Sequence, residues 1–412
     1  MVIDPGAEKI LCTLEEAGFE AYVVGGCVRD ALMGRVPEDW DITTNALPEQ
    51  VKTLFRKTFD TGIEHGTVTV LENGGSYEVT TYRIDGEYTD HRRPDKVCFA
   101  SDLYEDVARR DFTINAMAFH PRKGLKDYFE GKADLDRRLI RCVGEPEERF
   151  GEDALRMLRA VRFSAKLNFI IDSGTREAIC RLAPDLARVS RERILEEVTK
   201  TLISDHPEGL REAADTGLLR YFVPEAPEGV KDGSMLDFDT PSKVENKRAL
   251  RFAALMHPLD PETAGAYLRA LKADNELCRR VCRLLSRLGD EAPREGKDMR
   301  LWIHLTGRDL MEDLLALRLA AGVDDPETGE SLKILLDRER QAPVTLKELA
   351  VNGKTVISWG ACQGKELGDI LEQLLLWVLE DPGLNTEASL KHIYLTRYRN
   401  PMQDAGKQGE EA

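Results

Sequence analysis

The chain has 412 residues, of which 42% are hydrophobic and 32% are charged. That length predicts about two to four domains with well-buried cores. No run approaches 18 apolar residues, and residues 1–5 lack the basic and apolar character of a secretory signal, so we expect neither a membrane span nor secretion. Eight scattered cysteines do not predict a disulfide scaffold, which makes the cytoplasm the expected location.

The net charge of the chain is −16, which argues against nucleic acid as a partner when the molecule is treated as a whole. Phosphate binding depends on the local field, however, and the charge is not evenly spread. Residues 137–200 hold 14 Lys and Arg against 11 Asp and Glu, so this stretch carries +3. The charge pattern therefore leaves nucleic-acid binding open for this region.

Residues 1–140 mix helical and strand patterns. We predict an opening helix over residues 7–17, which ends at Gly18, a residue that favours the end of a helix. Residues 21–24 read as a short apolar strand, and a Gly25-Gly26 turn and a helix start follow. Alternation over residues 67–71 and 77–82 predicts two more strands.

From about residue 145 onward the patterns are helical. The predicted helices lie near residues 152–163, 176–182, 191–203, 210–216, 247–256, 264–288, 308–321 and 365–379. The polar end, residues 403–412, is expected to be disordered. The fold class is therefore α+β, with an N-terminal α/β head followed by an all-α remainder.

Acidic residues dominate the segment Glu38-Asp39-Trp40-Asp41-Ile42. In a strand, Asp39 and Asp41 would share one face and repel each other unless a cation lay between them. Glu78 lies on another predicted strand, and three such carboxylates suit Mg²⁺, with two ions arranged for phosphoryl transfer. The alternative is an acidic turn at a sheet edge.

The Gly25-Gly26 turn between a strand and a helix could let the backbone approach a phosphate. Arg29 follows it and can donate two parallel hydrogen bonds to phosphate oxygens. An ordinary tight turn explains two glycines equally well. Twelve residues separate Gly26 from Glu38, so the turn and the aspartates can share one cleft.

Together these segments resemble a known family. Val24-Gly25-Gly26-Cys27-Val28-Arg29-Asp30 followed by Glu38-Asp39-Trp40-Asp41-Ile42-Thr43-Thr44 is similar to the catalytic signature of class II tRNA nucleotidyltransferases and bacterial poly(A) polymerases, within the DNA polymerase β-like superfamily. Four further segments resemble later motifs of this family in the same order: residues 109–116, Asp127 with Gly131, residues 152–159 and residues 190–194.

The resemblance implies a domain order. Residues 1–138 would form the catalytic nucleotidyltransferase head with a small mixed sheet, and residues 139–205 a helical neck that selects the nucleotide. Residues 206–325 would be a helical body and residues 326–412 a helical tail that binds tRNA. No motif of the family can be placed beyond about residue 210.

The resemblance also implies residue roles. Asp39 and Asp41 would ligate the metal ions, and Glu78 would help to activate the primer 3′-hydroxyl. The remaining site residues are expected to bind the nucleotide: Gly25, Gly26, Arg29, Arg110, Asp111, Asn115, Asp153, Arg156, Arg159 and Arg162.

Asp153 and Arg156 are three residues apart, so on a helix they would be neighbours on one face. Asp accepts hydrogen bonds and Arg donates them. Cytosine and adenine each present an amino donor beside a ring-nitrogen acceptor, whereas uracil and guanine present the reverse. An Asp–Arg pair therefore suits C and A, in agreement with the templating role that the family assigns to these positions. A plain surface ion pair remains the alternative.

The expected activity is addition of CCA to the 3′ end of tRNA from CTP and ATP, without a template nucleic acid. In this family a flexible loop between Glu78 and Arg109 is needed for the switch from C to A, and its full length here argues against CC addition alone. Residues 62–67 resemble CCA-type sequences more than poly(A) polymerases. The alternatives are an A-adding enzyme, a poly(A) polymerase and a non-catalytic RNA-binding relative.

Overall fold

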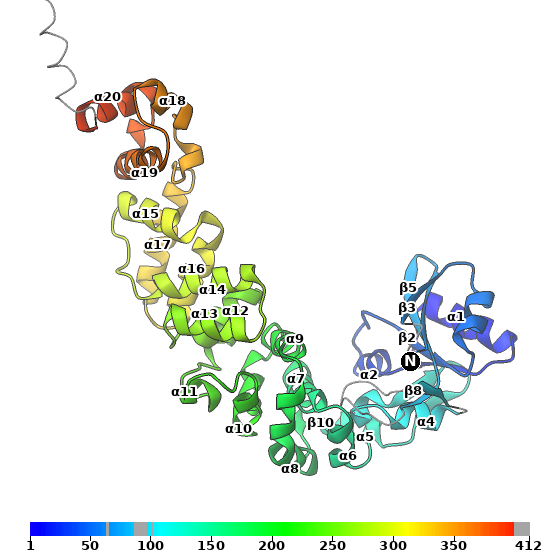
Figure 1. Cartoon of the computed structure of the whole chain (residues 1–412). Coiled ribbons are helices and arrows are strands. Elements are labelled where there is room, and N and C mark those ends of the chain that lie inside the picture. Colours follow the sequence, from blue (N-terminus) through cyan, green and yellow to red (C-terminus); the bar gives the residue numbers. More distant parts are fainter. Residues whose placement is uncertain (63–65, 86–96, 101, 399–412) are drawn as a thin grey trace, which may run out of the picture. The chain divides into compact units, whose positions relative to one another are not determined.

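The computed structural model describes residues 1–62, 66–85, 97–100 and 102–398 (Figure 1). The chain forms two compact units, which are described separately. The first contains residues 1–258 and 265–278, and the second contains residues 259–264 and the chain from residue 279 onward. Among the helices described, none combines the length and the apolar character needed to cross a membrane.

A mixed sheet forms the centre of the head. Its described strands follow the order β3-β4-β5-β2-β1-β8-β9, and β2 runs parallel to β5 while the other neighbours are antiparallel. The strands are β1 (Ala21–Val24), β2 (Asp41–Thr44), β3 (Thr58–Gly62), β4 (Thr67–Glu72), β5 (Gly75–Thr81), β8 (Met117–His120) and β9 (Gly124–Asp127). The small mixed sheet expected from the sequence is confirmed.

Short helices accompany this sheet, and two further strand pairs lie outside it. Both pairs have two strands: β6 (Arg83–Asp85) with β7 (Val97–Phe99), and β10 (Leu139–Ile140) with β11 (Ile170–Ile171). The helices of the head are α1 (Pro5–Glu16), α2 (Gly26–Leu32), α3 (Pro48–Leu54), α4 (Leu103–Ala108), the 3-10 helix η2 (Thr113–Asn115) and α5 (Gly131–Arg137).

Helix α1 shows how local sequence sets an element and its packing. The Asp4 carboxylate accepts hydrogen bonds from the backbone N–H groups of Gly6 and Ala7, which caps the helix. The same carboxylate accepts a hydrogen bond from the Tyr77 hydroxyl on β5, so the cap also ties the helix to the sheet. The apolar face of α1 is buried, with Leu14 fully hidden.

The rest of the first unit is helical. Its helices are α6 (Pro146–Glu152), α7 (Leu155–Leu167), α8 (Ser173–Leu182), α9 (Arg191–Leu202), α10 (Arg211–Asp215), α11 (Glu228–Lys231) and α12 (Arg248–Met256). Helices α13 (Pro261–Ala270) and α14 (Asn275–Leu288) contribute residues to both units. One continuous helical pattern was expected over residues 264–288, but Lys272 has a φ of 62°, which ends α13 before α14 begins.

The second unit is also helical, with α15 (Gly296–Thr306), α16 (Met311–Ala320), α17 (Pro326–Glu339), α18 (Gly353–Ser358), α19 (Lys365–Glu380) and α20 (Glu387–Arg397). Buried arginines join its elements. Arg318 is 2% exposed and donates two hydrogen bonds to the Asp324 carboxylate at 2.7 and 2.8 Å. Arg300 reaches the carbonyls of Leu379 and Glu380 at the end of α19, which supplies partners for terminal carbonyls.

His120 at the end of β8 is buried, and both nitrogens of its ring lie close to polar partners. The Nδ1 atom accepts hydrogen bonds from the backbone N–H groups of Arg122 and Lys123, and Nε2 lies 3.3 Å from the Glu15 carboxylate. Burial lowers the pKa of His120, and the nearby Lys123 and Arg122 charges act in the same direction, against the pull of Glu15.

We expect the stability of the protein to fall as the pH drops below about 6.5, because the unfolded chain then binds a proton that folded His120 does not. One such group contributes at most about 1.4 kcal/mol per pH unit. The variant His120→Asn keeps an acceptor near the Nδ1 position and cannot titrate. Urea unfolding between pH 7.5 and 5.5 should give a smaller loss of stability for His120→Asn than for the unmodified chain, and equal slopes would contradict this account.

Candidate active site

Two carboxylates face each other across the parallel pair of strands. In the register of β2 and β5, Asp41 lies opposite Glu78. Asp39 does not lie on β2 as expected from the sequence: the strand begins at Asp41, and Asp39 is an exposed residue in the segment before it. The alternating geometry of a strand therefore does not place the Asp39 side chain, although Asp39 is close enough to act on Asp41 electrostatically.

The charge of Asp41 reflects this crowding. Burial raises the pKa of the Asp41 carboxyl, the Arg110 guanidinium opposes that effect, and the like charges of Glu78 and Asp39 raise the pKa further. Oxygen ligands that repel one another suit a divalent cation. Within the described residues, no group of three or more His, Cys, Asp or Glu side chains is assembled closely enough to hold a metal by itself.

The glycine turn places an arginine next to these carboxylates. Gly25 has a φ of 83°, a conformation that favours glycine, and its N–H donates a hydrogen bond to the Met117 carbonyl at 3.1 Å. A Cβ atom on Gly25 would lie 2.8 Å from Nη1 of Arg110. The missing side chain therefore lets the Arg110 guanidinium lie against the turn. Gly26, the first residue of α2, has more space around it.

A chain of hydrogen bonds connects the head to the neck. Arg29 on α2 donates from Nη1 to the Asn115 side chain at 2.5 Å, and Asn115 in turn donates to Asp111 at 3.4 Å. Arg159 on α7 donates twice to Oδ2 of Asp111, at 2.8 and 2.6 Å. Burial would raise the pKa of Asp111, but the charge and hydrogen bonds of Arg159 hold it below its usual value. Asp111 is therefore ionised and held between head and neck.

One aromatic ring contacts three of the arginines. The centroid of Phe163 on α7 lies 4.4 Å from the Arg162 guanidinium and 5.5 Å from those of Arg29 and Arg159. Each cation–π contact contributes about 0.5–1 kcal/mol where the site is partly exposed. Arg162 also lies 2.7 Å from the buried Glu197 carboxylate on α9. Arg162 therefore joins two neck helices.

The segment expected to read the base is not one continuous helix. Helix α6 ends at Glu152 and α7 begins at Leu155, and Asp153 lies between them with an extended backbone. The i,i+3 helical geometry expected for Asp153 and Arg156 is therefore wrong. The Asp153 carboxylate accepts the backbone N–H of Leu155 at 3.1 Å, as expected for a helix-starting residue.

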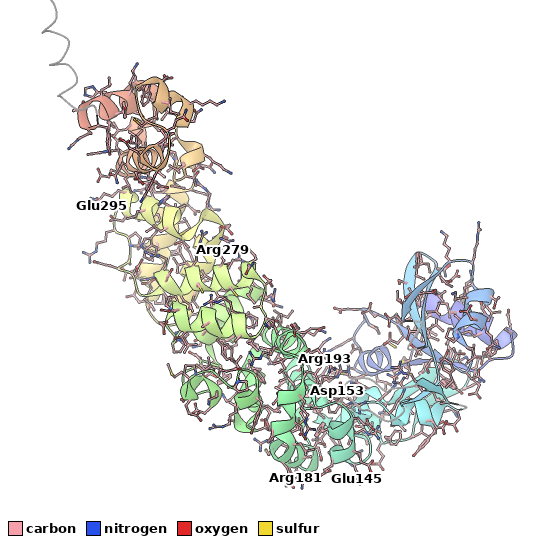
Figure 2. All side chains as sticks on the ribbon, viewed as in Figure 1. Glu145, Asp153, Arg181, Arg193, Arg279 and Glu295 are labelled. Carbon is pink, nitrogen blue, oxygen red and sulfur yellow. The ribbon has the colours of Figure 1, made fainter. Side chains whose placement is uncertain are left out.

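Arg193 on α9 holds Asp153 in place. Its two Nη atoms donate to the two oxygens of the Asp153 carboxylate, at 3.2 and 2.7 Å, and Figure 2 shows the two residues next to each other. Arg156 donates from Nη2 to the Arg109 carbonyl of the head at 3.1 Å and from Nη1 to the Arg149 carbonyl at 3.2 Å, and it also pairs with the Glu152 carboxylate of α6. The side chains of this segment are therefore ordered by contacts with α9 and with the head.

A single cavity in the first unit brings most of the predicted site residues together. Those that line it are Asp41, Glu78, Arg110, Asp111, Asp153, Arg156 and Arg159. The other predicted residues are not part of its lining: Gly25, Gly26, Arg29, Asp39, Asn115 and Arg162. Four of these, Gly25, Arg29, Asn115 and Arg162, contact lining residues or their supports, as described above.

Sequence reasoning missed several residues of this cavity. Thr67 and Thr80 line it and share a hydrogen bond at 3.0 Å, and Arg83 and Arg109 complete its wall. Arg193 also lines the cavity, and its place in residues 190–194, the last segment that resembles a motif of the family, was the available signal. The loop expected to govern the switch from C to A falls largely on residues 86–96, which lie outside the described residues. Residues 63–65 of the segment 62–67 and the polar end of the chain also lie outside them.

The mixed sheet with paired carboxylates, the glycine turn and the arginine-lined cavity define a nucleotidyltransferase head. In agreement, the family model of the poly(A) polymerase head domain matches residues 21–141. A model of the RNA- and SrmB-binding site of polymerase A matches residues 168–228, and one of tRNA nucleotidyltransferase domain 2 matches residues 244–393.

Relatives with known names match nearly the whole chain. The CCA-adding enzyme of Lactobacillus delbrueckii subsp. bulgaricus is 40% identical over 93% of this chain and 96% of its own length, and that of Geobacillus kaustophilus is 42% identical over 89% of each. The crystal structure of the Bacillus stearothermophilus CCA-adding enzyme in complex with CTP is 33% identical, with a TM-score of 0.83 and coverage of 98% of this chain and 100% of that one. This chain belongs to the CCA-adding enzyme family, whose members are nucleotidyltransferases that generally use divalent metal ions.

We expect Gly25→Ala to weaken binding of CTP about tenfold or more, because the new Cβ displaces the Arg110 guanidinium in addition to straining the backbone. Gly18→Ala is the matched control: Gly18 also has a positive φ, 89°, but nothing lies within 4 Å of its Cβ position. Both changes should cost about 1–2 kcal/mol of stability. Calorimetric titration with CTP should show the affinity loss in Gly25→Ala alone, and equal losses in both variants would refute the role of the Arg110 contact.

Proposed function

We propose that this chain adds CCA to the 3′ end of tRNA, from CTP and ATP, without a template nucleic acid. The observation that carries this proposal is the shared cavity, which contains the carboxylates Asp41 and Glu78 together with Asp153 and Arg156. One compartment can thus hold both the reacting phosphate and the base. The membership in the CCA-adding family supports the same activity.

We propose Mg²⁺ as the metal, with Asp39 and Asp41 as ligands and Glu78 as a further ligand or as the proton acceptor for the primer 3′-hydroxyl. Mg²⁺ is commonly held by one or two protein carboxylates, with water and substrate phosphate oxygens completing its shell. The facing pair Asp41 and Glu78 fits that pattern. When bound, the metal ions supply positive charge to the reacting phosphate and to the attacking oxygen.

The chain's own residues would position the triphosphate. Arg110 forms part of the cavity wall and lies against the Gly25-Gly26 turn, so phosphate oxygens can approach its guanidinium. Hydrogen bonds join Arg29 to Asn115 and Asn115 to Asp111, and Asp111 accepts a hydrogen bond from Arg159 of the neck. Through these contacts the three head residues would hold the wall in place for phosphate and ribose.

Asp153 and Arg156 would select the base. The Asp153 carboxylate accepts the exocyclic amino group of cytosine or adenine, and the Arg156 guanidinium donates to the adjacent ring nitrogen. Uracil and guanine would place a donor against the Arg156 donor and an acceptor against the Asp153 acceptor, and each mismatch costs about 1–3 kcal/mol. Arg159 and Arg162 support this segment through Asp111 and Glu197.

The helical remainder would bind the RNA. We propose that residues 139–205 act as the nucleotide-selecting neck after the catalytic head of residues 1–138, and that residues 206–325 and 326–412 are the body and the tRNA-binding tail. Recognition would rest on the shape of the RNA and on phosphate contacts, as is usual for double-stranded RNA.

The deciding experiment extends three tRNA transcripts, which end before CCA, after C and after CC, with CTP, ATP or both, in the presence or absence of Mg²⁺. We expect three additions to the first transcript and a stop at A. A single A added only to the CC end would indicate an A-adding enzyme, and unlimited A tails on any RNA a poly(A) polymerase. The double variant Asp39→Ala with Asp41→Ala should bind tRNA without extending it, and substantial extension by it would refute the metal assignment.

We expect Asp153→Ala to blur the choice of nucleotide more than it weakens binding of the triphosphate. The ratio of kcat/KM for CTP over UTP on the first transcript should fall by about tenfold or more, the size expected for one lost hydrogen bond to a charged group. Asp172→Ala, which removes a helix-starting carboxylate of the same neck at α8, is the control for general destabilisation. An unchanged ratio in Asp153→Ala would contradict the templating role.

A further inference from the structure

A buried carboxylate lies beneath the arginines of the cavity. Asp106 on α4 is 0% exposed and does not belong to the cavity lining. Its Oδ1 atom accepts two hydrogen bonds from Arg109, at 3.1 Å from Nε and 2.7 Å from Nη2. Its Oδ2 atom lies 3.8 Å from Nη2 of Arg110. One buried charge therefore faces two adjacent guanidinium groups that line the site.

The same carboxylate is tied to the strand that carries Asp41. The Thr43 hydroxyl on β2 donates to Oδ2 of Asp106 at 2.9 Å, and Thr43 is itself fully buried. Because Asp41 and Thr43 are two residues apart on one strand, they point to the same face of the sheet. Asp106 thus connects the arginine pair to the face of the sheet that holds Asp41 and Glu78.

Arg110 depends on this connection. In the part of the chain that the structure describes, its ion-pair partner is Asp106, and its buried Nε atom has no hydrogen-bond partner. Its guanidinium rests against Gly25 and acts electrostatically on Asp41. A cation with unused donors at the wall of the cavity is suited to an anion. Among the described residues, the charge of Asp106 and the shape of the Gly25 turn hold it there.

We propose that Asp106 is a positioning residue for the triphosphate: it holds Arg110, and with it Arg109, at a fixed place relative to the catalytic strand. This inference rests on the proposed nucleotidyl transfer and deepens it. The two arginines reduce the cost of burying the Asp106 charge, because both lower the pKa of its carboxyl against the effect of burial. The arrangement is one buried carboxylate shared by two half-buried guanidinium groups, so it keeps a net positive charge at the cavity.

The inference separates phosphate binding from base reading. Among the described contacts, Asp106 has none with Asp153 or Arg193, which hold each other. Arg156 reaches the backbone carbonyl of Arg109 and not the guanidinium that Asp106 holds. Removing the charge of Asp106 should therefore loosen the grip on the triphosphate and leave the preference for C over U unchanged. Asp153→Ala is expected to give the opposite pattern.

The test compares Asp106→Asn with the matched control Asp102→Asn. Both remove one negative charge from the same helix, but Asp102 is the exposed residue that caps α4, and Asn can still cap. We expect Asp106→Asn to weaken inhibition by inorganic triphosphate and to raise the KM for CTP, each about tenfold. The kcat at saturating CTP, the KM for tRNA and the CTP/UTP ratio of kcat/KM should stay within about threefold of the unmodified chain. Asp102→Asn should match the unmodified chain in all of them.

A second variant covers the case in which Asp106→Asn fails to fold. Thr43→Val keeps the shape of the side chain and removes the hydroxyl that holds Oδ2 of Asp106. It should raise the inhibition constant for triphosphate and the KM for CTP several-fold, and its effect should not add to that of Asp106→Asn.

Unchanged inhibition by triphosphate in a folded Asp106→Asn, or in Thr43→Val if the first variant does not fold, would overturn the proposal. Parallel losses in kcat, tRNA binding and the CTP/UTP ratio would also overturn it. Triphosphate binding can be measured by titration without turnover, so this test does not depend on the proposed function. If the unmodified chain bound triphosphate but extended no tRNA, the proposed function would be refuted. The comparison of triphosphate binding between the variants would still decide the role of Asp106.

Discussion

The parallel pairing of β2 with β5 imposes the main physical constraint on this protein, because it sets Asp41 directly opposite Glu78. Like charges in opposite positions of a sheet destabilise it. The surrounding cavity compensates with cations: its lining contains six arginines and four carboxylates, a balance of +2 in a chain whose net charge is −16. The global charge thus hides a local field that attracts phosphate, since the arginines are concentrated where the carboxylates meet.

The head and the neck meet through polar contacts that converge on few side chains. The Asp111 carboxylate accepts hydrogen bonds from Arg159 of the neck, and the ring of Phe163 contacts guanidinium groups from both the head and the neck. Contacts of this kind have strict geometry, so they hold Asp111 of the head at a defined place relative to α7 of the neck. This accounts for the predicted nucleotide-binding residues, Arg29 and Asn115 among them, that contact protein and do not line the cavity.

Much of the fold and seven of the fifteen residues that line the cavity could be predicted from the sequence. Strand alternation and the spacing of apolar residues place the sheet and the helices, and ordered motifs identify Asp41, Glu78 and Arg110. The failures are local and physical. Asp39 lies before the strand, and Asp153 lies between two helices, where its side chain accepts a hydrogen bond from the Leu155 N–H at the start of the second one. Pairings such as Asp106 with Thr43 or Asp153 with Arg193 join residues 63 and 40 positions apart, which no periodicity can indicate.

The position of Asp153 between two helices has a consequence for how selection works. Its carboxylate has about four acceptor positions, and in the described structure Leu155 and Arg193 occupy three of them. One acceptor position remains, and Arg193 has already oriented it. In the proposed base-reading role, the entropy of ordering this group would therefore be lost during folding and not at each round of binding. A side chain held in this way would accept one donor in the same geometry at every cycle, without a template strand.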